Sequence, residues 1–117
     1  MPCALSRRLY IQRILDLYRL APGTTGHIRR TDRQLAEAFH DRNISLEIVH
    51  ASLILAVARR TFRSGEPLTP IATLHYIRPL IEELLAEPPD PAYVNYIRHK
   101  LAAVAPEFAA AADHQLP

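Results

Sequence analysis

The sequence has few cysteine, methionine and tryptophan residues: its 117 residues include one cysteine, one methionine and no tryptophan. The single Cys3 cannot form a disulfide within the chain, so the fold has to rest on its apolar core. For the same reason we expect a reducing, cytoplasmic setting. No apolar run reaches the roughly 18 residues that a membrane span needs, and arginines interrupt the apolar residues near the N-terminus, so no signal-peptide pattern is present.

Lysine is also scarce, because thirteen of the fourteen basic residues are arginine. Residues 1–63 carry eleven arginines against five acids, a balance of +6, and residues 64–117 carry three basic residues against seven acids, a balance of −4. The arginine guanidinium presents a planar fork of donors that suits phosphate and carboxylate groups. The uneven charge predicts an anionic partner for the first half of the chain, and the alternative is a genome whose codons favour arginine.

An apolar stretch in the middle of the chain predicts a central helix over residues 45–62. Residues 51–58 are apolar on every side except at Ser52, and a helix without a polar face has to be surrounded by other helices. Ser45 is placed to cap this helix, with Ile44 and Val49 at the spacing of a hydrophobic staple. A length of 117 residues allows one domain that buries roughly two thirds of its unfolded surface.

Helical spacing of apolar residues also predicts helices before the central one. The first covers residues 5–20 and ends before a loop that contains Pro22. The second has the spacing of a capping box, with Thr31 as the cap and Gln34 reaching back to it. It stops near Asn43, a residue that tolerates the left-handed conformation found after helix ends.

Two further helices are predicted after the central one. Thr69 and Pro70 resemble a cap followed by a first-turn proline, which predicts a helix over 70–87 with a kink at Pro79. Asp90 and the proline after it repeat this arrangement for a helix that ends at Pro106. We therefore expect an all-α fold, a compact single domain of about five helices spanning residues 1–105, and an alanine-rich C-terminal tail over residues 106–117.

The candidate nucleic-acid-binding residues are arginines that gather at the ends of three predicted helices. If short loops bring those ends together, the side chains form one patch for phosphates and bind without reading sequence. The alternative is that each group only solvates its own helix end. The candidates are Arg7, Arg8, Arg29, Arg30, Arg33, Arg59, Arg60 and Arg63.

Other kinds of site find less support in the sequence. A helix-turn-helix reading fails because a buried central helix cannot also lie in the major groove. Most of the five tyrosines fall on apolar stripes, which indicates a place in the core rather than base stacking. Tyr96, His99 and Lys100 share a helix face without a neighbour that would activate them, and the spacing of Arg33 and His40 only loosely matches the pair found in helical HEPN ribonucleases. The histidines lack metal-ligand spacing, so we expect no enzyme, no cofactor and no metal.

Residues 46–56, Leu-Glu-Ile-Val-His-Ala-Ser-Leu-Ile-Leu-Ala, form an apolar segment in the middle of the chain. This segment is similar to the apolar helix of the C-terminal helical domain of DnaD-like replication-initiation proteins. Residues 74–81, Leu-His-Tyr-Ile-Arg-Pro-Leu-Ile, are similar to its later Tyr-Ile motif, although the family's tryptophan is absent and Pro79 interrupts the helix. The resemblance covers roughly residues 31–87 and implies a helical module that binds DNA weakly and meets replication partners.

Together these features predict a non-catalytic helical module that contacts nucleic-acid phosphates, DNA or RNA, within a replication or mobile-element complex. The alternative is a protein–protein adaptor in which an apolar groove and the acidic second half hold a partner helix. A small homo-oligomer with Ile48 and Ile54 at its interface is a form of the same alternative.

Overall fold

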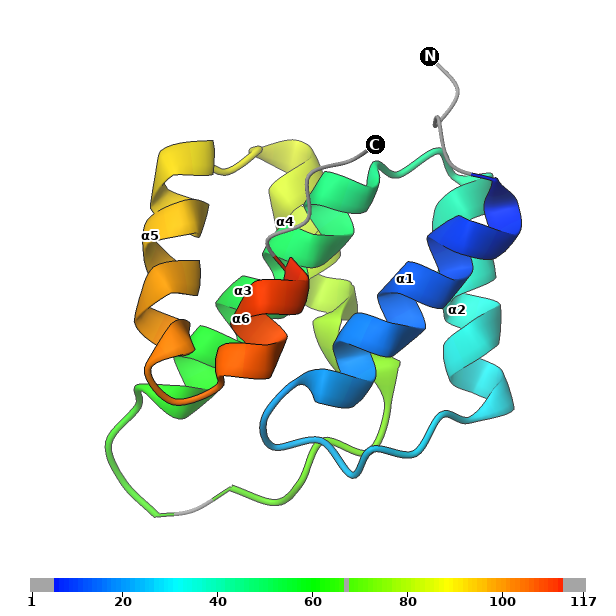
Figure 1. Ribbon diagram of the computed structural model, residues 1–117. Helices are drawn as coiled ribbons and strands as arrows, with labels where there is room; N and C mark the ends of the chain where they lie inside the picture. The colour runs from blue at the N-terminus through cyan, green and yellow to red at the C-terminus, as the bar shows by residue number, and fades with distance from the viewer. Residues whose placement is uncertain (1–5, 67, 113–117) are drawn as a thin grey trace.

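The computed structural model describes residues 6–66 and 68–112, and each regular element in these ranges is a helix. The elements in chain order (Figure 1) are α1 Arg7–Leu20, α2 Arg30–Asp41, α3 Leu46–Thr61, the 3-10 helix η1 Leu74–Ile77, α4 Arg78–Ala86, α5 Pro91–Ala102 and α6 Pro106–Ala112. The all-α prediction is confirmed, with one α-helix more than expected. None of the described helices is long and apolar enough to cross a membrane. The predicted helix start at residue 5 lies outside the described residues.

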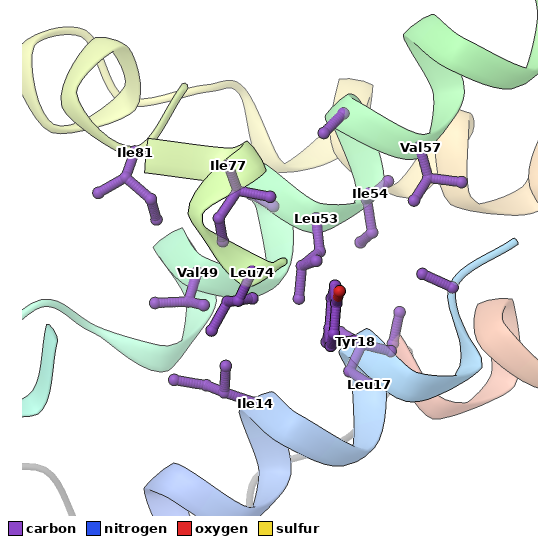
Figure 2. Packing of buried hydrophobic residues seen from close by; sticks show 14 of the residues in the cluster. Ile14, Leu17, Tyr18, Val49, Leu53, Ile54, Val57, Leu74, Ile77 and Ile81 are labelled. Atoms are coloured by element: carbon purple, nitrogen blue, oxygen red, sulfur yellow. The ribbon is translucent and has the colours of Figure 1, made fainter. Parts of the chain in front are cut away.

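Helix α3 is the central helix that the sequence predicts. Its sixteen residues include eleven buried ones, among them Ser52, whose hydroxyl is satisfied by donating to the carbonyl of Ile48 at 2.9 Å. The predicted cap is also present, since the Ser45 hydroxyl accepts a hydrogen bond from the Ile48 amide at 3.2 Å. Helices α1, α4, α5 and η1 all pack against α3. In Figure 2 the apolar side chains of α3 meet those of α1, η1 and α4 in one cluster that includes Ile14, Leu17, Tyr18, Val49, Leu53, Ile54, Val57, Leu74, Ile77 and Ile81.

The start of α2 differs from the prediction. The helix begins at Arg30, and Asp32 rather than Gln34 reaches back, accepting a hydrogen bond from the amide of Arg29 at 2.9 Å. Thr31 is therefore a residue of the first turn and not the cap. A carboxylate in the first turn satisfies a free amide and also faces the positive end of the helix dipole.

The end of α2 follows the prediction. Asn43 has a φ of 58°, the left-handed conformation expected of it. The amide of Asn43 donates to the carbonyl of His40 at 2.9 Å. The amide of Ile44 donates to the carbonyl of Phe39 at 3.1 Å. This pair of bonds is a Schellman motif, which satisfies two carbonyls at the helix end and turns the chain toward α3.

The predicted helix over 70–87 is wrong at its start. Ile71 instead forms an isolated bridge with Thr24, so the chain is extended there, and Thr73 caps η1. Pro79 lies in the first turn of α4, where a missing amide costs nothing. The predicted kink at Pro79 is confirmed as the junction between η1 and α4, where the amide of Arg78 donates to the carbonyl of His75.

The C-terminal part of the domain is more ordered than the sequence indicates. Asp90 caps α5 as predicted, accepting a hydrogen bond from the amide of Ala92 at 2.9 Å. Pro106 does not end that helix, which stops at Ala102, but begins α6. Residues 106–112 were expected to start a tail, yet they form a helix that packs on α1 and α5 and buries Phe108. The remaining tail, 113–117, lies outside the described residues.

Candidate nucleic-acid interface

The eight candidate arginines do not form one patch, because α2 separates them. Arg7 and Arg8 open α1, and Arg7 forms an ion pair with Asp41 at the C-terminal end of α2. Arg29 and Arg30 stand at the other end of α2, which is about 18 Å long at 1.5 Å per residue. The first pair therefore lies at one end of the molecule and the other six candidates at the opposite end, which carries the loops (Figure 1).

The six arginines at the loop end divide into two groups on opposite sides of that end (Figure 1). Arg29, Arg30 and Arg33 surround the start of α2 and are exposed. Their guanidinium groups make no hydrogen bond or ion pair with the residues that the structure describes. The second group, Arg59, Arg60 and Arg63, extends from the end of α3.

Arg60 is half-buried, and its side chain packs against the loops at this end of the molecule. Its guanidinium donates to the carbonyl of Thr69, and its side chain runs against Gly23, where an added Cβ would lie 2.8 Å from Arg60 Nε. The backbone of Gly23 in turn accepts a hydrogen bond from the amide of Ile71 at 2.6 Å. Arg60 therefore holds the two loops of this end together, which is a structural role.

Arg59 and Arg63 remain available at the surface. The Arg59 side chain is 68% exposed and reaches Glu83 only at 3.9 Å, a contact that contributes little in solvent. Arg63 Nη1 donates to the backbone carbonyl of Glu66 at 3.0 Å. Because a guanidinium has five N–H donors, this single bond leaves the others free to bind a phosphate.

A further cation, not among the predicted nucleic-acid-binding residues, lies at the end of α5. Lys100, in the last turn of α5, places its ammonium 5.1 Å from the ring centre of Phe62 and 5.7 Å from that of Tyr96. The contact joins the end of α3 to the end of α5. We call Arg59, Phe62, Arg63, Tyr96 and Lys100 the basic–aromatic patch. The available signal was the i, i+4 spacing of Tyr96 and Lys100, but nothing in the sequence places Phe62 beside them.

The tyrosines divide between the core and the surface. Tyr10 and Tyr18 are buried as predicted, and the Tyr10 hydroxyl donates to the carbonyl of Ile44 at 2.6 Å. Burial is the main cause that raises the pKa of Tyr18; the charge of Asp32 adds to it and that of Arg29 opposes it. The other three, Tyr76, Tyr93 and Tyr96, are exposed, which contradicts the expected core placement.

The acidic residues of α4 lie partly in ion pairs with the basic half of the chain. Arg42 donates two hydrogen bonds to the Glu82 carboxylate, at 2.7 and 3.1 Å. This hydrogen-bonded guanidinium lowers the pKa of Glu82, and the same contact raises the pKa of Arg42. The pair neutralises one acid on the α4 surface.

A groove of about 770 Å³ lies between α3, α5 and α6. Its apolar lining includes Ile48, Ala51, Ile54 and Val94, and Glu47, His50, Asn95 and Arg98 supply polar groups. Of the two positions that the sequence suggests for an interface, Ile48 is half-buried at this groove, whereas Ile54 is 3% exposed and belongs to the core. The groove therefore gives the adaptor alternative a physical location.

Within the described ranges, no group of three or more histidine, cysteine, aspartate or glutamate side chains is arranged to hold a metal ion. No family model, curated protein or solved structure matches this chain. The kinship with DnaD-like proteins remains an expectation.

Proposed function

We propose that this domain binds the phosphates of a nucleic acid, without catalysing a reaction on it, through the basic–aromatic patch. The observation that carries the proposal is that Lys100 of α5 contacts Phe62 at the end of α3, the helix end from which the exposed Arg59 and Arg63 extend. The resemblance to DnaD-like proteins suggests a replication or mobile-element complex as the setting.

The chemistry of these side chains supports phosphate binding. The guanidinium groups of Arg59 and Arg63 match two phosphate oxygens at once, and Lys100 adds a compact charge. Lys100 forms no ion pair among the described residues, so a phosphate would not have to displace a carboxylate from it. The group Arg29, Arg30 and Arg33 offers a second region of positive charge at the same end of the molecule.

Salt dependence tests the proposal. Each neutralised phosphate releases counterions, so three contacts with a duplex should give a slope of about −2.7 for log affinity against log salt. The measurement is a titration of the intact chain with labelled oligonucleotides, single- and double-stranded, starting at about 50 mM salt. Affinity should hardly depend on sequence, because the central helix is buried and cannot read base edges.

A matched pair of variants locates the contact. Replacing Arg59, Arg63 and Lys100 together by alanine should weaken binding to every sequence and flatten the salt slope. The control replaces Arg7, Arg8 and Arg13 of α1, which removes the same charge and should leave the slope nearly unchanged. Absence of binding into the high micromolar range at low salt, or equal losses in the two triple variants, would contradict the proposal.

The groove between α3 and α5 favours a second candidate, an adaptor or small homo-oligomer. Apolar contacts release no counterions, so such an assembly should respond little to salt. Light scattering would give the mass of the parent and of Ile48→Glu, with Leu85→Glu as an exposed control on α4. A larger assembly that only Ile48→Glu dissociates would support this candidate, and a monomeric parent would remove the homo-oligomer.

A further inference from the structure

The rings in the basic–aromatic patch have no core role that explains their position. Phe62 is 45% exposed and Tyr96 is 57% exposed, although aromatic side chains of this size usually bury most of their surface. Neither ring belongs to the apolar core cluster. The ammonium of Lys100 approaches both rings, so an aromatic surface and a positive charge coincide.

We infer that the patch takes a single-stranded nucleic acid, with unpaired bases stacked on Phe62 and Tyr96 and adjacent phosphates bound by Arg59, Arg63 and Lys100. The inference rests on the proposed function and adds the class of strand. Lys100 Nζ lies over both rings, so a base that stacks on them either uses the remaining exposed face or displaces the ammonium toward the phosphate of its own nucleotide.

A duplex cannot use the rings in this way. Its bases are stacked on one another and paired, so their faces are closed to an aromatic side chain, and only the phosphates remain within reach. The two strand classes therefore share the cations but not the rings. This difference allows the inference to fail while the proposed function survives.

The stacking surface extends along α5. Tyr93 lies three residues before Tyr96, on the same helix face, and is 54% exposed. Tyr93 stands one turn farther from Phe62 and Lys100 than Tyr96 does. A strand that has covered Phe62 and Tyr96 would reach Tyr93 next, so Tyr93 should matter only when the oligonucleotide is long enough.

The experiment compares three probes on the intact chain: single-stranded DNA, single-stranded RNA and duplex DNA, each about 12 nucleotides long. Phe62→Leu and Tyr96→Leu keep apolar bulk but remove the π-face. Each should weaken binding of single strands by about 5- to 100-fold and that of the duplex by less than about 2-fold. Tyr93→Leu should weaken binding of the full probe but not of one about 4 nucleotides long.

Two controls separate stacking from folding. Tyr96→Phe keeps the ring and should bind single strands like the parent, whereas Leu9→Ala alters an exposed apolar residue of α1 and should change nothing. Phe62→Trp supplies a reporter in a chain without tryptophan, and its fluorescence should be quenched by single strands but not by the duplex.

The outcomes distinguish base stacking on the rings from phosphate binding by the cations. Equal affinity for single strands and duplex, with no effect of Phe62→Leu or Tyr96→Leu, would overturn the stacking inference and leave phosphate binding intact. No binding of any probe would remove both. Selective losses in the single-stranded arms would support the inference, and the tighter of the DNA and RNA probes would identify the sugar that the patch prefers.

Discussion

The carboxylate of Asp32 accepts a hydrogen bond from the amide of Leu74, 42 residues later in the chain, at 2.9 Å. The same oxygen accepts the hydroxyl of Thr73 at 2.8 Å, and the other oxygen caps α2 through the amide of Arg29. Asp32 is fully buried, so this one side chain fixes both the start of α2 and the start of η1. The contact decides where the chain turns into α4.

Asp32→Ala should therefore destabilise the domain by about 3 kcal/mol, because it leaves buried donors without an acceptor. Asp32→Asn should cost less, since its amide oxygen can still accept from Leu74 and only the bond from Arg29 is lost. Urea unfolding of the three proteins measures the difference. Equal stability of parent and Asp32→Ala would show that these bonds contribute nothing net.

The cavity prediction concerns Leu53, which is 2% exposed on α3 and packs against the side chains of η1 and α1 (Figure 2). Leu53→Ala should lower the free energy of unfolding by about 2–5 kcal/mol, the range for a leucine lost from a core. Leu85→Ala on the exposed side of α4 is the matched control and should cost well under about 1 kcal/mol. Thermal melts that fail to separate the two variants would refute a central role for α3.

The turn after α2 offers a pair of substitutions that act through the backbone alone. Asn43→Ala should destabilise the domain by about 1 kcal/mol, because a Cβ without a polar partner disfavours the left-handed conformation. Asn43→Gly should be neutral or slightly stabilising, since glycine adopts a φ of 58° freely. Reversal of this order in denaturant unfolding would mean that the amide side chain itself holds the turn.

The pair Arg42–Glu82 predicts a pH effect of defined sign. Because the folded state lowers the pKa of Glu82 below its usual 4.5, the stabilisation is fully present above that value and disappears as the pH falls through the folded-state pKa. Parent and Glu82→Gln should thus differ at about pH 7 and converge toward about pH 3. Introducing Arg42→Gln first should remove the pH-dependent difference, and a gap that persists at low pH would assign the effect to another cause.

The elements that the sequence predicts well are those whose signals are local. Ser45 and Asp90 lie directly before the helices they cap, and Asn43 lies directly after the one it ends. The central helix was also predictable, because residues 51–58 are apolar on every side except at Ser52 and such a helix has to be buried, whichever helices surround it. In each case the residues that determine the structure lie within a few positions of one another in the chain.

The errors arose where a distant contact decides the outcome. Pro70 resembled a first-turn proline, but Ile71 is held by the backbone of the loop near Thr24, which keeps the chain extended there. Tyr93 and Tyr96 share a wide apolar stripe with Ile97 and Leu101, and only packing against α3 and α6 decides which half of it is buried. The binding surface was half predictable: the arginines were visible, but the partner helix that brings Lys100 to Phe62 was not.

Helix α6 has a consequence for how the domain is made in the cell. It fills the space between α1 and α5 with the fully buried Phe108, so the first and last described helices complete the core together. A nascent chain on the ribosome cannot close this core until residues through Ala112 have been synthesised and have left the exit tunnel. Until then the apolar surface of α1 that α6 covers stays exposed, and the final collapse follows translation of α6.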